Sequence, residues 1–213
     1  MPPTRRQGPR IQGVVSIIRL RAAAPPDALL DALVAGGVES VEVTLNTPGA
    51  LDTIGRWAAR GVARVGVGTV RTARQAAAAI DAGAQFLVTP TTVPAVLETA
   101  RGRGVPVACG ALTPTEIDLA WSGGADVVKV FPVSDAGGPG YLRAVSEPLD
   151  DVPLLPTGGV RVDDLAAYAR AGAVGVGVGG SLVGEALVAA GDWEAVAARA
   201  RSWTTRWREA RDG

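Results

Sequence analysis

Short β-branched runs alternate with alanine-rich helical runs along the whole chain of 213 residues. The pattern predicts strands at 14–20, 40–45, 64–70, 86–90, 105–111, 127–132, 154–160 and 174–180. It predicts helices at roughly 26–35, 49–60, 72–82, 92–103, 114–122, 140–147, 163–171 and 192–210. Strict alternation of strands and helices implies a parallel sheet, and eight such units favour closure into a (β/α)8 TIM barrel of the α/β class.

An open, doubly wound sheet is the competing architecture. In dinucleotide folds of that kind the glycine loop follows the first strand, whereas here the glycine-rich segment 176–181 follows the eighth. The connections are short and no linker interrupts them. We therefore expect a single barrel domain over residues 1–213, with residues 1–13 forming a short N-terminal extension.

Composition excludes several classes of function. The 21 basic and 21 acidic residues give zero net charge, and no basic stripe or array of aromatic residues indicates a nucleic-acid partner. No apolar run reaches the ~18–20 residues that span a bilayer, and no secretory signal is visible, so we expect a cytoplasmic protein. Histidine is absent and Cys109 is the only cysteine, which excludes histidine-based catalysis and makes a transition-metal site improbable, although carboxylates could hold magnesium.

Lys129 is the only lysine among the 21 basic residues. It lies in a predicted strand, where alternation places Val127, Lys129 and Phe131 on one face. Desolvation inside a barrel favours the uncharged amine, which can attack a ketone, whereas arginine stays protonated. The alternative is a chance survivor in an arginine-rich composition, which fits a surface position better than a Val/Phe strand.

Glu42 and Thr44 share a face of the predicted strand 40–45. If this face points inward, Glu42 can carry protons for Lys129, and the two side chains are the minimum set for Schiff-base carbon–carbon chemistry. If Glu42 points outward, it pairs with an arginine instead.

Two polar, glycine-rich turns follow the seventh and eighth predicted strands. They consist of Thr157, Gly158 and Gly159, and of Gly179, Gly180 and Ser181. Backbone N–H groups at these positions of a barrel, with a short extra helix near 181–187, commonly bind phosphate. The alternative is that both are only tight strand-to-helix turns.

Arg19 and Thr69 lie at the ends of the first and third predicted strands. Arg19 could hold a carboxylate or be an ordinary surface charge. Thr69 could donate a hydrogen bond to an anionic substrate or cap the next helix.

Several segments occur in an order that resembles the 2-keto-3-deoxy-6-phosphogluconate (KDPG) and 4-hydroxy-2-oxoglutarate aldolase family, class I enzymes of the Entner–Doudoroff pathway. They are Val-Glu-Val-Thr-Leu-Asn-Thr (41–47), Gly-Val-Gly-Thr-Val (66–70), Gly-Ala-Gln-Phe-Leu-Val-Thr-Pro (83–90), Thr-Pro-Thr-Glu (113–116), Val-Lys-Val-Phe-Pro (128–132), Gly-Pro-Gly-Tyr-Leu (138–142), Leu-Pro-Thr-Gly-Gly-Val (155–160) and Val-Gly-Val-Gly-Gly-Ser (176–181). The resemblance implies a (β/α)8 barrel that assembles as a homotrimer.

The resemblance also implies a role for each matching residue. Lys129 matches the Schiff-base lysine and Glu42 the general acid–base. Arg19, Thr69 and Pro90 match the carboxylate end of the substrate site. Thr157, Gly158, Gly159, Gly179, Gly180 and Ser181 match its phosphate end.

The predicted function is a class I aldolase, a lyase without a metal or cofactor, that cleaves 2-dehydro-3-deoxy-6-phosphogluconate to pyruvate and glyceraldehyde 3-phosphate. 4-Hydroxy-2-oxoglutarate is a further expected substrate. Asn46 stands where some members carry an arginine and is closer to the 6-phosphogalactonate aldolases, so the galactonate epimer is an alternative. A phosphosugar isomerase or epimerase, and a non-catalytic phosphate-binding barrel, are the alternatives from other classes.

Overall fold

A closed barrel of eight parallel strands forms the centre of the computed structural model, which describes residues 10–212. The strands are β1 (Gly13–Ile18), β2 (Ser40–Thr44), β3 (Arg64–Gly68), β4 (Phe86–Val88), β5 (Val107–Ala111), β6 (Val127–Val130), β7 (Leu154–Pro156) and β8 (Gly175–Val178). Each strand pairs in parallel with its neighbour in the chain, and β8 pairs with β1. The parallel bridges Leu154–Ala173 and Thr157–Gly177 join β7 to β8 and close the ring. The predicted barrel is therefore confirmed, and the open sheet is wrong.

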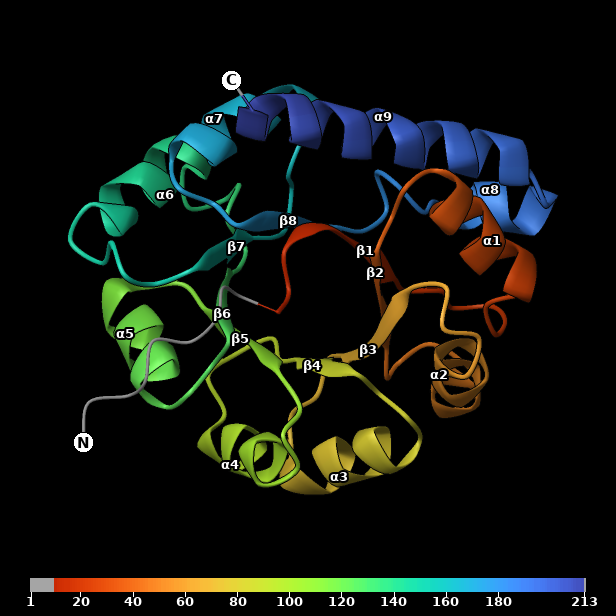
Figure 1. Ribbon diagram of the computed structural model, residues 1–213, viewed down its shortest axis with the longest axis horizontal. Coiled ribbons are helices and arrows are strands. Elements are labelled where there is room, and N and C mark those ends of the chain that lie inside the picture. Colours follow the sequence, from red (N-terminus) through yellow and green to blue (C-terminus); the bar gives the residue numbers. More distant parts are fainter. Residues whose placement is uncertain (1–9, 213) are drawn as a thin grey trace.

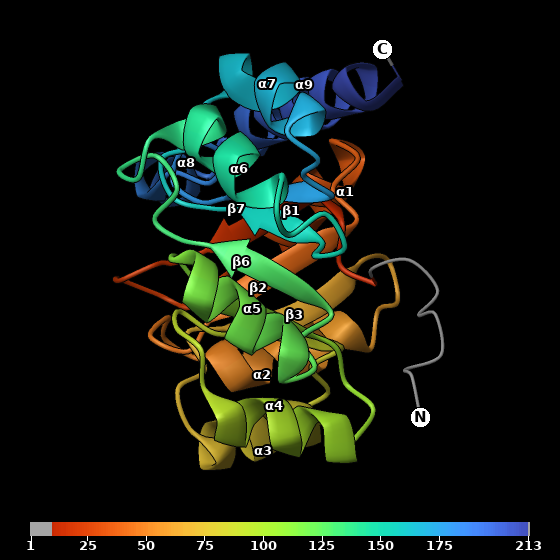
Figure 2. The same cartoon turned by 90° about the vertical axis from the view of Figure 1, so that its left-hand side faces the viewer.

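The helices form an outer layer around the strands (Figure 1). They are α1 (Asp27–Ala35), α2 (Ala50–Ala58), α3 (Ala73–Asp81), α4 (Pro94–Gly102), α5 (Pro114–Ser122), α6 (Gly138–Ser146), the 3-10 helix η1 (Val162–Asp164), α7 (Leu165–Arg170), α8 (Glu185–Ala190) and α9 (Trp193–Asp212). The long α9 packs across α1 and α7, and the second view shows it with α7 at one end of the molecule (Figure 2). No helix in the described part of the chain is both long and apolar enough to cross a membrane.

Strand alternation divides the buried side chains into two cores. One lies between the strands and the helices and includes Ile18, Val43 and Val128. The other fills the barrel and consists of Ile11, Val15, Phe86, Val88, Ala108, Val127 and Leu155, with Val174 against it. Because successive strand residues face opposite sides, Val127 inside the barrel fixes Lys129 on the inner face as well.

The predicted strands extend too far at their carboxyl ends. β1, β3, β4, β6, β7 and β8 each end two to four residues before the predicted position. In most of them polar and glycine residues leave the hydrogen-bonded ladder and enter loops, whereas after β6 the residues that do so are Phe131 and Pro132. These loop residues are largely the predicted site residues, as expected at the functional end of a barrel.

The predicted N-terminal extension falls mostly on residues 1–9, which lie outside the described residues. Of its described part, Ile11 is fully buried in the barrel core and Gly13 begins β1. Arg10 forms an ion pair with Asp126 and donates to the carbonyl of Gly104.

Candidate active site

Lys129 lies on β6 with its side chain inside the barrel and only 5% exposed. Its Nζ is 5.2 Å from the centroid of the Phe131 ring, one inward position further along. Within residues 10–212 no carboxylate forms an ion pair with it. The predicted inward face of Val127, Lys129 and Phe131 is therefore confirmed, and the amine lies near the Phe131 ring.

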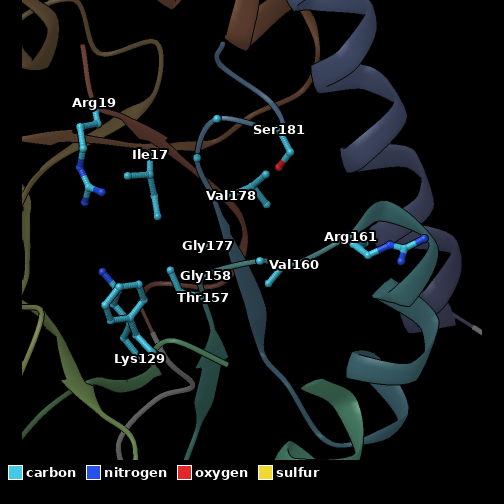
Figure 3. A pocket seen from close by; sticks show the side chains of 14 residues that line it. Ile17, Arg19, Lys129, Thr157, Gly158, Val160, Arg161, Gly177, Val178 and Ser181 are labelled. Carbon is cyan, nitrogen blue, oxygen red and sulfur yellow. The ribbon is translucent and has the colours of Figure 1, made fainter. Parts of the chain in front are cut away.

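A cavity of about 440 Å³ opens at the carboxyl ends of the strands, with Lys129 in its wall. Arg19 and Lys129 lie on the same side of it, whereas the turns after β7 and β8 form the opposite side (Figure 3). The predicted site residues that line it are Arg19, Lys129, Thr157, Gly158, Gly159, Gly179, Gly180 and Ser181. Lys129 and the two glycine turns therefore line the same cavity.

Glu42 is buried inside the barrel on β2, 2% exposed. Its Oε1 has no hydrogen-bond partner among the described residues. Burial raises the pKa of this carboxyl, while the charges of Lys129 and Arg19 act to lower it. The inward alternative for Glu42 is therefore confirmed, and the carboxyl is poised to take up a proton near the lysine.

Gly68, the last residue of β3, makes room for Glu42. A Cβ at this position would lie 1.8 Å from Glu42 Oε1, much closer than any real contact. The missing side chain is therefore what allows the carboxyl to occupy its place.

The resemblance makes Glu42 the general acid–base, and a displaced base loses most of its effect, so we expect Gly68→Ala to lower kcat by about 100-fold or more. Gly102→Ala is the matched control, since a Cβ there would meet nothing within 4 Å. Steady-state kinetics on both variants, with circular dichroism to verify folding, tests the role. A folded Gly68→Ala enzyme with unchanged kcat would refute it.

The turns after β7 and β8 present unpaired backbone donors. Within residues 10–212, the N–H groups of Gly158, Gly159, Gly180 and Ser181 have no hydrogen-bond acceptor. Gly158 and Gly159 have φ of 90° and 72°, a left-handed conformation that favours glycine. Free N–H groups gathered on one side of a cavity suit an anion such as phosphate.

The three residues predicted at the carboxylate end differ in position, since only Arg19 lines the cavity. Arg19 follows β1 and makes no hydrogen bond or ion pair within the described residues. Thr69 follows β3 with φ of 61°, a strained value for a β-branched residue. Pro90 and Thr69, like the buried Glu42, are not part of the cavity wall.

The loop that carries Pro90 is tied to β5. Thr89 Oγ1 accepts from the Gly110 N–H at 2.9 Å, and Thr92 Oγ1 donates to the Gly110 carbonyl at 3.0 Å. Thr89 also donates to Cys109 Sγ at 3.7 Å. Cys109 belongs to the core between strands and helices, and it does not line the cavity. Burial raises the pKa of its thiol.

Sequence reasoning missed part of the cavity wall. The missed residues are Ile17, Phe131, Val160, Arg161, Gly177 and Val178. Ile17 and Gly177 could have been found from alternation, since they lie two residues before Arg19 and Gly179. Arg161 follows the glycine turn, but Figure 3 shows its side chain pointing away from Lys129.

A buried lysine, a buried carboxylate and turns with free backbone N–H groups at the carboxyl end of a (β/α)8 barrel are together typical of class I aldolases, which join a lysine to a ketone. No cluster of three or more His, Cys, Asp or Glu side chains that could hold a metal ion occurs in the part of the chain that the structure describes.

The chain belongs to the KDPG and KHG aldolase family, whose model matches residues 8–199. A 2-dehydro-3-deoxy-phosphogluconate aldolase of Pseudomonas aeruginosa is 39% identical over 204 residues, which cover 95% of this chain and 91% of the relative. A 2-dehydro-3-deoxy-6-phosphogalactonate aldolase of Escherichia coli K12 is 35% identical over 173 residues, covering 76% and 82%.

One similar solved structure contains a covalent reaction intermediate. The KDPG aldolase from Legionella pneumophila, with pyruvate captured as a covalent carbinolamine, superposes with a TM-score of 0.81 at 27% identity, covering 91% of this chain and 94% of that one. The family resemblance noted in the sequence is confirmed.

Proposed function

We propose that this protein cleaves 2-dehydro-3-deoxy-6-phosphogluconate to pyruvate and glyceraldehyde 3-phosphate through a Schiff base on Lys129. The observation that carries the proposal is the buried Lys129 and Glu42 beside a cavity whose opposite side presents free N–H groups. The names of the Pseudomonas and Legionella relatives support the substrate, and the carbinolamine of the latter supports the covalent step.

In the proposed mechanism, the neutral amine of Lys129 adds to the C2 ketone. Loss of water from the carbinolamine gives an iminium ion, and Glu42 moves the protons of these steps. Glu42 then takes the C4 hydroxyl proton, directly or through a water. The C3–C4 bond breaks, its electron pair forms an enamine, and glyceraldehyde 3-phosphate leaves. Protonation of the enamine at C3 and hydrolysis release pyruvate and restore the amine, so no metal or cofactor is required.

The two ends of the substrate are assigned to opposite sides of the cavity. Arg19 binds the carboxylate, because its guanidinium is unpaired and lies on the side of Lys129 (Figure 3). The resemblance also places Thr69 and Pro90 at this end, although neither residue lines the cavity wall. The phosphate binds on the opposite side of the cavity, which is lined by Thr157, Gly158, Gly159, Gly179, Gly180 and Ser181.

The decisive experiment measures pyruvate release from three substrates: the 6-phosphogluconate-derived acid, its galactonate epimer and 4-hydroxy-2-oxoglutarate. We expect the highest kcat/KM on the gluconate-derived acid and a lower value on the unphosphorylated acid, because only the phosphorylated acids use the glycine turns. Absence of pyruvate from all three would contradict the proposal.

The galactonate epimer is the second candidate. Asn46 is exposed after β2 and forms no hydrogen bond within the described residues, so an arginine is absent at a position where some gluconate enzymes have one. The Escherichia coli relative named for the galactonate substrate supports this candidate. A higher kcat/KM for that epimer would establish it.

We further propose that the protein is a cytoplasmic homotrimer. Sedimentation equilibrium should then give three times the chain mass of 21.6 kDa.

Activity should also survive dialysis against EDTA, because the proposed mechanism uses no metal ion.

A further inference from the structure

The backbone around Arg19 is held by two buried hydroxyl groups from β2 and the loop that follows it. Thr44 is 0% and Thr47 is 3% exposed. Both Oγ1 atoms lie 3.3 Å from the carbonyl oxygen of Ile18, and they are 3.1 Å from each other. Thr47 Oγ1 also accepts from the Leu20 N–H at 3.3 Å.

These contacts form one relay around a single residue. Each hydroxyl has one proton, so Leu20 N–H can donate to Thr47, Thr47 to Thr44, and Thr44 to the Ile18 carbonyl. The relay satisfies every group in it and starts and ends on the two neighbours of Arg19. Hydrogen bonds in such a chain strengthen one another in a buried setting.

A third contact, from a different element, holds the backbone of Arg21. Oε1 of Glu185, the first residue of α8, accepts from the Arg21 N–H at 2.5 Å. The backbone from residue 18 to residue 21 is therefore fixed by groups from β2, from the loop after it and from α8.

The Arg19 side chain gains no such support. It is exposed at the cavity wall and has no hydrogen bond or ion pair within residues 10–212. A long side chain binds a ligand more tightly when its backbone is fixed. Any backbone motion that remains in the free protein must be lost on binding, which costs conformational entropy.

We propose that Thr44 and Thr47 are positioning residues that set Arg19 for binding the substrate carboxylate, with Glu185 completing this backbone clamp. The proposal rests on the proposed function, in which Arg19 takes the carboxylate next to the ketone that Lys129 attacks. It predicts that loss of a clamp hydroxyl weakens the recognition of a 2-keto acid and leaves the amine chemistry intact.

The test is borohydride trapping of pyruvate on Lys129 over a range of pyruvate concentrations. In Thr47→Val we expect the half-saturating pyruvate concentration to rise about three- to tenfold. This effect is smaller than the complete loss of a charge-assisted hydrogen bond, because Arg19 itself is still present. The limiting trapping rate should stay the same. Thr47→Ser, which keeps the hydroxyl, should restore the wild-type value.

Two further arms separate positioning from a merely structural role. Trapping of acetone, which has no carboxylate, should be equal in Thr47→Val and wild type. In an Arg19→Met background, Thr47→Val should have no additional effect on pyruvate, because the two changes then remove the same interaction. An added effect in that background, or an equal loss with acetone, would overturn the clamp.

Glu185→Ala provides a second route if Thr47→Val fails to fold, because Glu185 is exposed. It should raise the pyruvate half-saturation as well, whereas Glu185→Gln keeps an acceptor for Arg21 N–H and should not. Unchanged pyruvate half-saturation in Thr47→Val and Glu185→Ala, with normal trapping in the wild type, would refute the clamp alone. No adduct in the wild type would refute the proposed function itself, and the clamp with it.

Discussion

Lys129→Arg is expected to lower cleavage by about 10⁴-fold or more, because arginine stays protonated and cannot form the Schiff base. The variant keeps a positive charge at the same inward position of β6, so it removes the nucleophile and leaves most of the electrostatics. Pyruvate release measured at saturating substrate gives the effect on kcat. Arg74→Lys is the control, since it makes the reverse replacement at an exposed position of α3. It should keep full activity.

Retained cleavage in Lys129→Arg would contradict the covalent mechanism. It would favour an isomerase or epimerase type of chemistry, which uses Glu42 and the phosphate turns without a covalent step. The expected result is the loss of cleavage by about 10⁴-fold or more, with retained binding of inorganic phosphate.

Glu42→Gln is expected to have opposite effects on activity and stability. Loss of the proton carrier should lower kcat by about 10²–10⁴-fold. The same change should raise the melting temperature at pH 8, because burial raises the pKa of Glu42 and its ionised form therefore costs folding free energy.

The sign of this pH dependence follows from the raised pKa. The folded state favours the protonated carboxyl, so Glu42 costs little at a pH below its ordinary range and more as the pH rises through that range and up to the folded-state value. The gain in Glu42→Gln should therefore be largest at pH 8 and shrink toward pH 4.5, with roughly 2–4 °C for each kcal/mol in a domain of this size.

Glu39→Gln is the matched control, since Glu39 is exposed and precedes the same strand. It should change neither kcat nor the melting temperature by a measurable amount. If Glu42→Gln were less stable than the wild type at pH 8, the desolvation of Glu42 would not be the dominant contribution to its pKa.

The barrel could be predicted from the sequence because each of its elements has a local signature. Strand runs such as 127–130 are short and β-branched, and helices begin at recognisable positions such as the capping box of Thr113 and Glu116. The strand ends could not be predicted, because a residue such as Thr69 or Thr157 is compatible with a strand and leaves it only when the neighbouring strand ends. The position at which a strand ends is decided by its pairing with neighbouring strands, and the local sequence pattern does not contain that information.

The site divides in the same way. Alternation is enough to group Lys129 with Val127 and Phe131, and Glu42 with Thr44, but it leaves open whether the face of Glu42 points into the barrel. The role of Gly68 could not be predicted, since it depends on a carboxyl from the preceding strand, β2, lying 1.8 Å from the position of its missing Cβ. The Thr44–Thr47 relay likewise depends on the distance between β2 and the end of β1, which the sequence of either strand does not contain.

Reduction of the complex with pyruvate by borohydride tests the central claim most directly. The sequence contains one lysine, so a reduced pyruvyl adduct on an internal peptide can have only one position. Mass spectrometry of the digested protein should show the adduct on the peptide that contains Lys129, in proportion to the loss of activity. An inactivated protein without that adduct, or full activity after complete reduction, would contradict the Schiff-base mechanism.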